Sequence, residues 1–132
     1  MRRVVVTGMG AVTPLASGVE ATWRRLVAAE SGVGPITRFD PANLPARIAG
    51  QVPRPNERAD AFNPDDWMEP KEQRKVDDFI IFAVAAAEQA MKDAGWKADT
   101  EEKQVRTGVL IGSGIGGLDG IAKTALLLEE KG

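Results

Sequence analysis

The residues that most suggest chemistry are three glycines that follow an apolar run. Residues 109–117 read VLIGSGIGG, which gives Gly112, Gly114 and Gly117 the G-x-G-x-x-G spacing of dinucleotide-binding loops. Glycines permit positive φ and the close approach of another group. The acidic residue that such a loop needs, at the end of a second strand, is missing, because the glutamates at 129–130 end a predicted helix. We therefore favour a tight turn over a nucleotide site, and the spacing does not identify the approaching group.

Nucleophiles, bases and metal ligands are scarce. Ser113 lies between glycines, but Ile111 occupies the position of the first glycine of a nucleophile elbow. The chain contains no histidine and no cysteine, so the usual base for a hydroxyl and the thiol nucleophile are both absent. Adjacent carboxylates, such as Asp77 and Asp78, are typical of a solvated surface, and no metal-ligand set is visible. We assign no catalytic residue and no metal ligand.

A basic cluster is the more telling feature. In the sequence KEQRK, Lys71, Arg74 and Lys75 are spaced i, i+3 and i+4, so they would share one face at the predicted start of a long helix. A helix N-terminus favours acidic side chains by about 0.3 to 1 kcal/mol each, so three cations there oppose local preference. Such a conflict often marks function, here the binding of an acidic surface or a phosphate. A solvated face partly neutralised by Glu69 and Glu72 is the alternative.

Length and composition describe a globular chain of one-domain size. It has 132 residues, of which 43% are hydrophobic and 27% charged, and a formal net charge of −2. That charge gives no general attraction to nucleic acid or to an anionic membrane, so we expect neither as a partner. No run of 18 apolar residues exists, and the apolar run after MRR is too short for a signal sequence. We expect a cytoplasmic protein.

Two short β-branched runs predict strands of an α/β fold. Residues 3–7 (RVVVT) and 107–111 (TGVLI) are continuously apolar and precede glycines, as in parallel strands covered on both faces. Residues 33–70 carry seven of the eight prolines. We predict a proline-rich surface excursion there, with one strand candidate at 46–52 and a helical turn after Asn63-Pro64.

Three helices are predicted, over residues 17–29, 71–94 and 118–130, with a polar connector over 97–106. A serine–glutamate capping box begins the first helix, which would bury Trp23, Leu26 and Val27. The second ends at Gly95 and is apolar on nearly all sides, as in a helix that is buried all round. Two or three strands cannot enclose such a helix, because sheets usually have about five or six. We expect this chain to be the first part of a larger fold.

Together these stretches resemble the beginning of the beta-ketoacyl-acyl carrier protein synthases, most closely the type II condensing enzymes of bacterial fatty-acid synthesis. The resemblance spans the chain and rests on RRVVVTGMGAVTPL, TWRRLVAAESGVGPITRFD, ARIAGQV, KEQRKVDDFIIFAVAAAEQAMKDAG and TGVLIGSGIGGL. It implies a thiolase-like fold of two similar α/β halves, each with a five-stranded mixed sheet around a buried central helix. Residues 1–132 would then form the N-terminal segment of the first half.

The resemblance also implies an activity for the complete enzyme. In this family an acyl group passes to a cysteine thiolate, malonyl-carrier protein is decarboxylated, and a Claisen condensation elongates the acyl chain. Two histidines and a lysine support these steps. The cysteine and both histidines would lie outside residues 1–132, so this chain alone is expected to be inactive. The partners would be acyl carrier protein, with its phosphopantetheine-linked acyl and malonyl groups, and a second subunit of a homodimer. No cofactor is implied.

Two sets of residues in this chain take roles from the resemblance. The set that would dock the acidic carrier protein is Lys71, Arg74 and Lys75. The set that would line the acyl pocket is Gly114, Ile115 and Gly116, with Ile115 swinging to admit longer chains. Plain core packing is the alternative for Ile115. For the whole chain, the alternatives are a non-catalytic chain-length-determining homologue, a polyketide-type ketosynthase and a nucleotide-dependent oxidoreductase.

Overall fold

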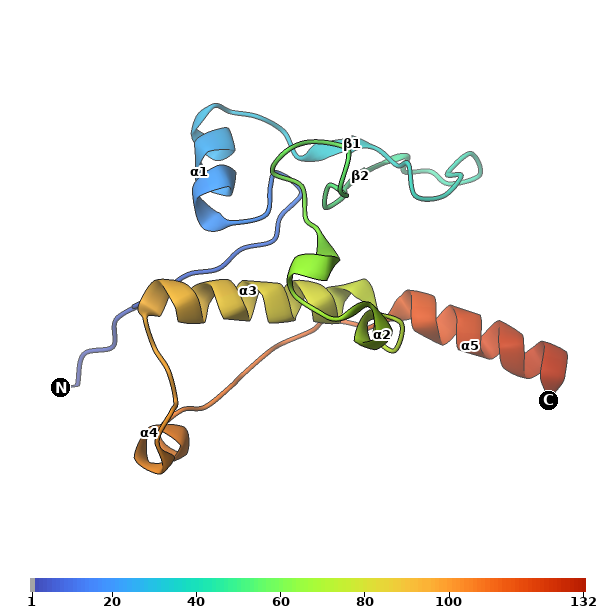
Figure 1. Cartoon of the computed structure of the whole chain (residues 1–132). Helices are drawn as coiled ribbons and strands as arrows, with labels where there is room; N and C mark the ends of the chain where they lie inside the picture. Colours follow the sequence, from blue (N-terminus) through green and yellow to red (C-terminus); the bar gives the residue numbers. More distant parts are fainter. Residues whose placement is uncertain (1) are drawn as a thin grey trace.

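The computed structural model describes residues 2–132, which are organised around one long helix (Figure 1). This helix, α3 (Asp78–Ala94), runs through the centre, and α5 (Leu118–Lys131) projects away from near its amino end. The smaller helix α4 (Glu101–Val105) lies apart from α3 on extended connections. The remaining elements are α1 (Val19–Val27), β1 (Val33–Pro35), β2 (Ile48–Gly50), the 3-10 turn η1 (Pro64–Asp66) and α2 (Pro70–Gln73).

The long helix begins later than the sequence predicted. Residues 70–73 form the separate helix α2, which starts with a proline at its first position, and Arg74 is its C-cap. Asp77, with extended backbone angles of φ −79° and ψ 156°, is the N-cap of α3. Aspartate favours this position, and its extended backbone interrupts the helical pattern. The predicted continuous helix from Lys71 is therefore wrong, whereas its end at Gly95 (φ 62°, left-handed) is confirmed.

The first helix forms, but without its predicted cap and packing. Its N-cap is Gly18 rather than Ser17, and no side chain caps it; the Ser17 N–H donates to the carbonyl of Asp60 (3.1 Å) before the helix begins. The apolar side chains that were expected to be buried are 54% to 69% exposed. Within residues 2–132 no element covers that side of α1, so the capping box and the buried stripe are both wrong for this structure.

One small antiparallel sheet is present in the described chain. Val33, Gly34 and Pro35 of β1 pair with Gly50, Ala49 and Ile48 of β2. Strand β2 lies inside the segment predicted at 46–52. The sequence missed β1, because a three-residue strand containing glycine and proline has no β-branched pattern.

The two strands predicted at 3–7 and 107–111 do not form in this structure. Both segments run as extended traces in Figure 1, but neither pairs with another strand among residues 2–132, and Val4 and Leu110 are 95% and 99% exposed. A strand requires a partner to complete its ladder. The five-stranded mixed sheet is accordingly not formed by the described residues, which contain only the two-stranded one.

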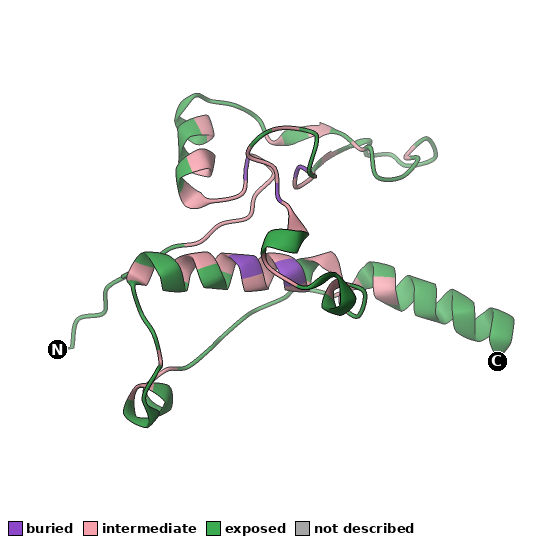
Figure 2. Cartoon of the chain, viewed as in Figure 1, coloured by how far each residue is buried: buried purple, intermediate pink, exposed green. Residues whose placement is uncertain are grey.

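The core is small and lies on one side of α3 (Figure 2). Phe62 packs edge-to-face on Phe82, with ring centroids 5.1 Å apart, and the cluster also contains Ile81 and Ala85. Phe62 is 2% exposed, whereas Met91 of α3 is 40% exposed. In this chain α3 is therefore buried along one stripe rather than all round, because the described residues supply packing for one side only.

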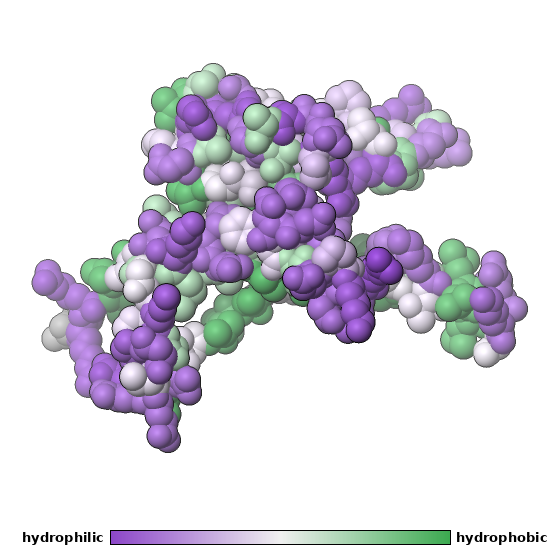
Figure 3. All heavy atoms as spheres, viewed as in Figure 1, coloured by the Kyte–Doolittle hydropathy of each residue, from purple (hydrophilic) through white to green (hydrophobic). Residues whose placement is uncertain are grey.

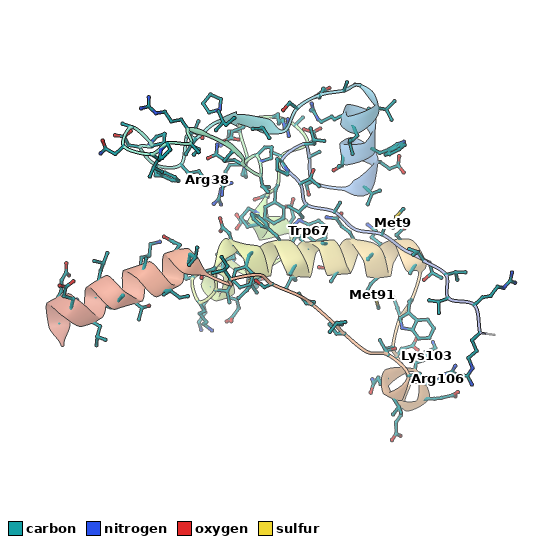
Figure 4. The ribbon with its side chains drawn as sticks, turned by 180° about the vertical axis from the view of Figure 1, so that it is seen from behind. Met9, Arg38, Trp67, Met91, Lys103 and Arg106 are labelled. Atoms are coloured by element: carbon teal, nitrogen blue, oxygen red, sulfur yellow. The ribbon has the colours of Figure 1, made fainter. Side chains whose placement is uncertain are left out.

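The amino-terminal segment packs tightly on the second half of α3. The Met9 N–H donates to Asp93 Oδ2 (2.9 Å), and Figure 4 shows Met9 and Met91 on opposite sides of this end of the helix. A Cβ on Gly8 or Gly10 would lie 2.3 Å or 1.9 Å from a backbone oxygen of α3. Only glycine permits this approach, which explains the two glycines after the first apolar run.

Of the remaining helical segments, two were predicted and one was not. The turn after Asn63 is confirmed as η1, and the Asn63 side chain accepts a hydrogen bond from the Asp65 N–H (3.3 Å). The connector over 97–106 contains the unpredicted helix α4, which Thr100 caps by accepting from the Lys103 N–H (3.3 Å). The last predicted helix is confirmed as α5, whose bounds differ by one residue.

A large part of the apolar surface is exposed. Figure 3 shows hydrophobic atoms along the extended segment that leads from α4 back to α3, and again near the end of α5. The exposed residues include valines 4–6, residues 109–111 and four apolar residues of α5 that are 59% to 67% exposed. In the part of the chain that the structure describes, no helix is long and apolar enough to span a bilayer.

Candidate functional site

The glycine-rich turn over residues 112–117 joins the extended segment to α5. The Gly116 N–H donates to Ser113 Oγ (3.2 Å), and Gly116 has φ +81°, which glycine adopts without strain. Ile115 is 73% exposed. A Cβ added at Gly114 would meet no described atom within 4 Å. Ile115 therefore stands in open space rather than in the core of this chain.

The group that approaches the turn is the carboxylate of Asp77. A Cβ on Gly117 would lie 1.4 Å from Asp77 Oδ2, and one on Gly120 would lie 2.8 Å from the same oxygen. The two glycines leave room for this side chain at the amino end of α5, which is where a dinucleotide would place its pyrophosphate. The negative charge of Asp77 would repel that group. The turn geometry thus disfavours the nucleotide interpretation.

The basic residues lie in a short exposed segment just before α3. Lys71 is in the last turn of α2, Arg74 is its C-cap and Lys75 follows. Arg74 and Lys75 follow the end of a helix, where cations are favourable, so the predicted conflict with a helix N-terminus does not apply to them. Lys71 is the second residue of the single turn of α2 and therefore lies near both of its ends. Lys75 Nζ lies 2.6 Å from Glu72 Oε1, whereas Lys71 and Arg74 form no ion pair with any residue in the range 2–132.

The structure brings the two predicted sets of residues to the same end of α3. Figure 1 shows α2 and the start of α5 together there. Asp77 follows the basic segment and contacts Gly117, and Phe79 Cζ lies 4.0 Å from the Cβ position of Gly116. The basic segment and the glycine-rich turn are therefore linked through the first residues of α3.

Asp78 joins the start of α3 to the segments that follow β1 and β2. Its carboxylate forms ion pairs with Arg54 and, at 3.7 Å, with Arg38. Arg38 also donates to the carbonyl of Val52 (2.7 Å), and Figure 4 shows its side chain between the sheet and α3. Asp78 remains 43% exposed and Asp77 half-buried, so the prediction of a solvated surface holds in part, but both carboxylates also contact other parts of the chain. The sequence carried no local signal for these partners, which are distant along the chain.

A second charged cluster holds α1 against the loop that follows β2. Arg25 binds Asp60 through two nitrogens, at 2.9 Å and 3.1 Å, and also binds Glu30. Burial raises the pKa of Asp60, but hydrogen bonding and charge from Arg25, with the charge of Arg58, lower it below its ordinary value overall. The same two partners, Glu30 and Asp60, raise the pKa of Arg25. This cluster is structural and lies apart from the glycine-rich turn.

The described residues contain no cluster of three or more histidine, cysteine, aspartate or glutamate side chains placed to hold a metal ion. The residues gathered at the amino end of α3 are suited to binding. They include Lys71 and Arg74, which have no ion pair within residues 2–132, and the exposed Ile115, which lies on a turn with open space around Gly114. The arrangement contains no nucleophile paired with a base. Chemistry at this site would need groups from elsewhere.

Comparison with known proteins gives the family. The sequence model described as "Beta-ketoacyl synthase, N-terminal domain" matches residues 1–132. A 3-oxoacyl-[acyl-carrier-protein] synthase 2 from Rhizobium meliloti is 53% identical over 132 residues, which is 100% of this chain and 31% of that protein. The corresponding Vibrio cholerae protein is 44% identical over 131 residues, covering 99% of this chain and 30% of its own length. Other relatives carry mitochondrial and chloroplastic names.

A solved structure agrees with these sequences. The structure titled "The ishigamide ketosynthase/chain length factor" superposes with a TM-score of 0.62 at 37% identity, covering 74% of this chain and 23% of that one. The chain thus spans about a third or less of the proteins that it matches. Its fold is that of a ketosynthase N-terminal domain, which is thiolase-like. The chain belongs to the beta-ketoacyl synthase N-terminal domain family.

Proposed function

We propose that this chain is the N-terminal segment of the first half of a 3-oxoacyl-acyl carrier protein synthase that elongates fatty acyl chains. The observation that carries the proposal is the 53% identity, over the whole chain, to a protein of that name. In the complete enzyme the acyl group passes from the carrier's phosphopantetheine thiol to a cysteine. Malonyl-carrier protein then loses CO₂, and the resulting enolate attacks the acyl thioester as the cysteine thiolate leaves.

In this proposal the chain supplies binding rather than bond-breaking groups, since it contains neither cysteine nor histidine. Lys71, Arg74 and Lys75 dock the acidic carrier protein, which is supported by their exposure and by the lack of an ion pair for Lys71 and Arg74 within residues 2–132. The acyl chain passes beside Gly114, Ile115 and Gly116, which is supported by the exposed isoleucine and the open space around it. No metal or redox cofactor is required.

We further propose that residues 3–7 and 107–111 become strands of a five-stranded mixed sheet in the complete synthase, a cytoplasmic homodimer in which α3 is buried. The support is their extended backbone and high exposure, since apolar side chains that are 58% to 99% exposed gain by burial. Amide hydrogen exchange tests this. The amides of residues 109–111 should exchange slowly in the complete fold and rapidly in the 132-residue chain, whereas equally rapid exchange in both would contradict it.

A chimera tests the activity. The present chain would replace the matching region of the Rhizobium meliloti synthase, which then supplies the remaining residues. We expect a soluble chimera that converts an acyl-carrier protein and malonyl-carrier protein to the 3-oxoacyl product. The unaltered Rhizobium protein is the positive control. A folded chimera without condensation activity would contradict the proposal.

One alternative has an observation in its favour. The similar solved structure is titled a ketosynthase/chain length factor, so a polyketide-type or chain-length-determining role is the second candidate. The same chimera distinguishes the two when it is supplied with carrier proteins from fatty-acid and polyketide synthesis. Turnover with the fatty-acid carrier supports the first proposal, and turnover only with the polyketide carrier supports the second.

A further inference from the structure

Asp77 occupies an N-cap position but does not cap its own helix. Aspartate at this position usually accepts a hydrogen bond from the second or third N–H of the helix that it begins. The Asp77 side chain makes no such bond with α3. Its carboxylate lies instead against α5, a helix some 40 residues later whose own N-cap is Gly117 and which has no side-chain cap.

The two glycines of α5 form a cradle for this carboxylate. The Cβ positions of Gly117 and Gly120 lie 1.4 Å and 2.8 Å from Asp77 Oδ2, so a side chain at either position, and above all at Gly117, would displace the carboxylate. Both glycines are half-buried, unlike their exposed neighbours. Gly117 has φ −87°, which any residue adopts, so the backbone conformation does not require glycine there. Glycine is required at this position by the close approach of the Asp77 carboxylate.

Electrostatics favours the same arrangement. The first N–H groups of a helix are unpaired and carry a partial positive charge, so a carboxylate is stabilising at the start of α5. Lys123, one turn into α5, has its pKa raised by a hydrogen bond with Asp119 and, to a smaller extent, by the charges of Asp77 and Asp78. Asp77 therefore links the amino ends of two helices.

This link fixes one end of the glycine-rich turn. Ile115 precedes Gly117 by two residues, and between them Gly116 lies close to Phe79 of α3. No described atom lies within 4 Å of the Cβ positions of Gly112 and Gly114, at the other end of the turn. A change at Asp77 would consequently move Ile115 more than it would move the body of α3.

We propose that Asp77 is a positioning residue that holds the glycine-rich turn against α3 and thereby sets the acyl-chain-length preference through Ile115. The part of the proposal that concerns chain length rests on the proposed function. The contact itself does not, so the two parts are tested by different measurements on the chimera.

Thermal unfolding tests the contact. Gly117→Ala should lower the melting temperature, or prevent folding, because its Cβ collides with Asp77. Asp77→Gly removes the carboxylate at small cost to α3, since glycine is tolerated at an N-cap. The double variant should recover most of the loss caused by Gly117→Ala alone. A tolerated single Gly117→Ala variant, or a double variant no better than that single one, would overturn the contact.

The acyl-length profile tests the positioning role. Asp77→Asn keeps the shape but removes the charge, so the ratio of kcat/KM for long and short acyl chains should change by about 2- to 5-fold. Asp78→Asn is the matched control, because its carboxylate pairs with Arg38 and Arg54 instead. An equal loss for all chain lengths, or the same change in both variants, would overturn the role. If the chimera has no activity at all, the proposed function fails while the melting experiment still reports on the contact.

Discussion

Reversal of charge in the basic segment should weaken carrier-protein binding unequally. Lys71 and Arg74 have no ion-pair partner among residues 2–132, whereas Lys75 already binds Glu72 at 2.6 Å. An exposed ion pair contributes about 0.2 to 1 kcal/mol, and a reversal replaces attraction with repulsion. Lys71→Glu or Arg74→Glu should therefore raise the Kd by about 2- to 30-fold at low salt. Lys75→Glu should raise it less, because Glu72 already neutralises that cation.

Binding of a labelled acyl-carrier protein to the chimera would measure these effects at low and high ionic strength. The differences should shrink with salt, because exposed charges are screened. Acyl transfer from a small pantetheine thioester should be unchanged, since that substrate does not use the docking surface. Lys97→Glu, at the other end of α3, is the control. Equal losses with the small thioester, or a Lys75→Glu effect larger than that of Lys71→Glu, would refute the reasoning.

Three further predictions concern the core, the charged cluster and the turn. Phe62→Ala in the chimera should cost about 3 to 5 kcal/mol of unfolding free energy, measured with urea, because Phe62 is 2% exposed and packs on Phe82; a cost below 1 kcal/mol would contradict the core assignment. Because the folded pKa of Asp60 lies below 3.8, its stabilisation is complete above that pH and is lost as the pH falls through the folded pKa. The stability difference between the chimera and Asp60→Asn, followed from pH 6 to pH 3, should shrink toward acid, and a constant difference would contradict this. Ile115→Phe should shorten the longest acyl chain that is elongated, as read from the product profile, and an unchanged profile would count against its place in the pocket.

The parts of the fold that the sequence predicted are those set by neighbouring residues. Gly95 ends α3 because glycine accepts the left-handed conformation, and Asn63-Pro64 begins η1 through a local cap. The start of α3 was missed because Val76, the first apolar residue of the helical period, lies inside the break at residues 74–77, and the polar residues before it carry no signal that α2 ends there. The strands predicted at 3–7 and 107–111 failed in this chain because a ladder depends on partners, which a local pattern cannot supply.

The residues of the candidate site were predictable from the sequence, but their contacts with distant parts of the chain were not. Residue type and the family resemblance selected the basic segment and Ile115, and the structure places both at one end of α3. The sequence could not predict that Gly117 makes room for the Asp77 carboxylate. The two residues are far apart along the chain, and their contact depends on how α5 meets α3. The charge argument was wrong for Arg74 and Lys75 for a related reason, since it assumed one continuous helix where the structure has two and these residues follow the first of them.

The most direct test of the central claim, that this chain is part of a condensing synthase, is the reaction stoichiometry of the chimera with the Rhizobium meliloti protein. We predict that the folded chimera releases one CO₂ from malonyl-carrier protein for each acyl chain extended, at a rate within about tenfold of the parent, a difference of about 1.4 kcal/mol in activation free energy. A folded chimera that binds carrier protein but forms no 3-oxoacyl product would contradict the claim.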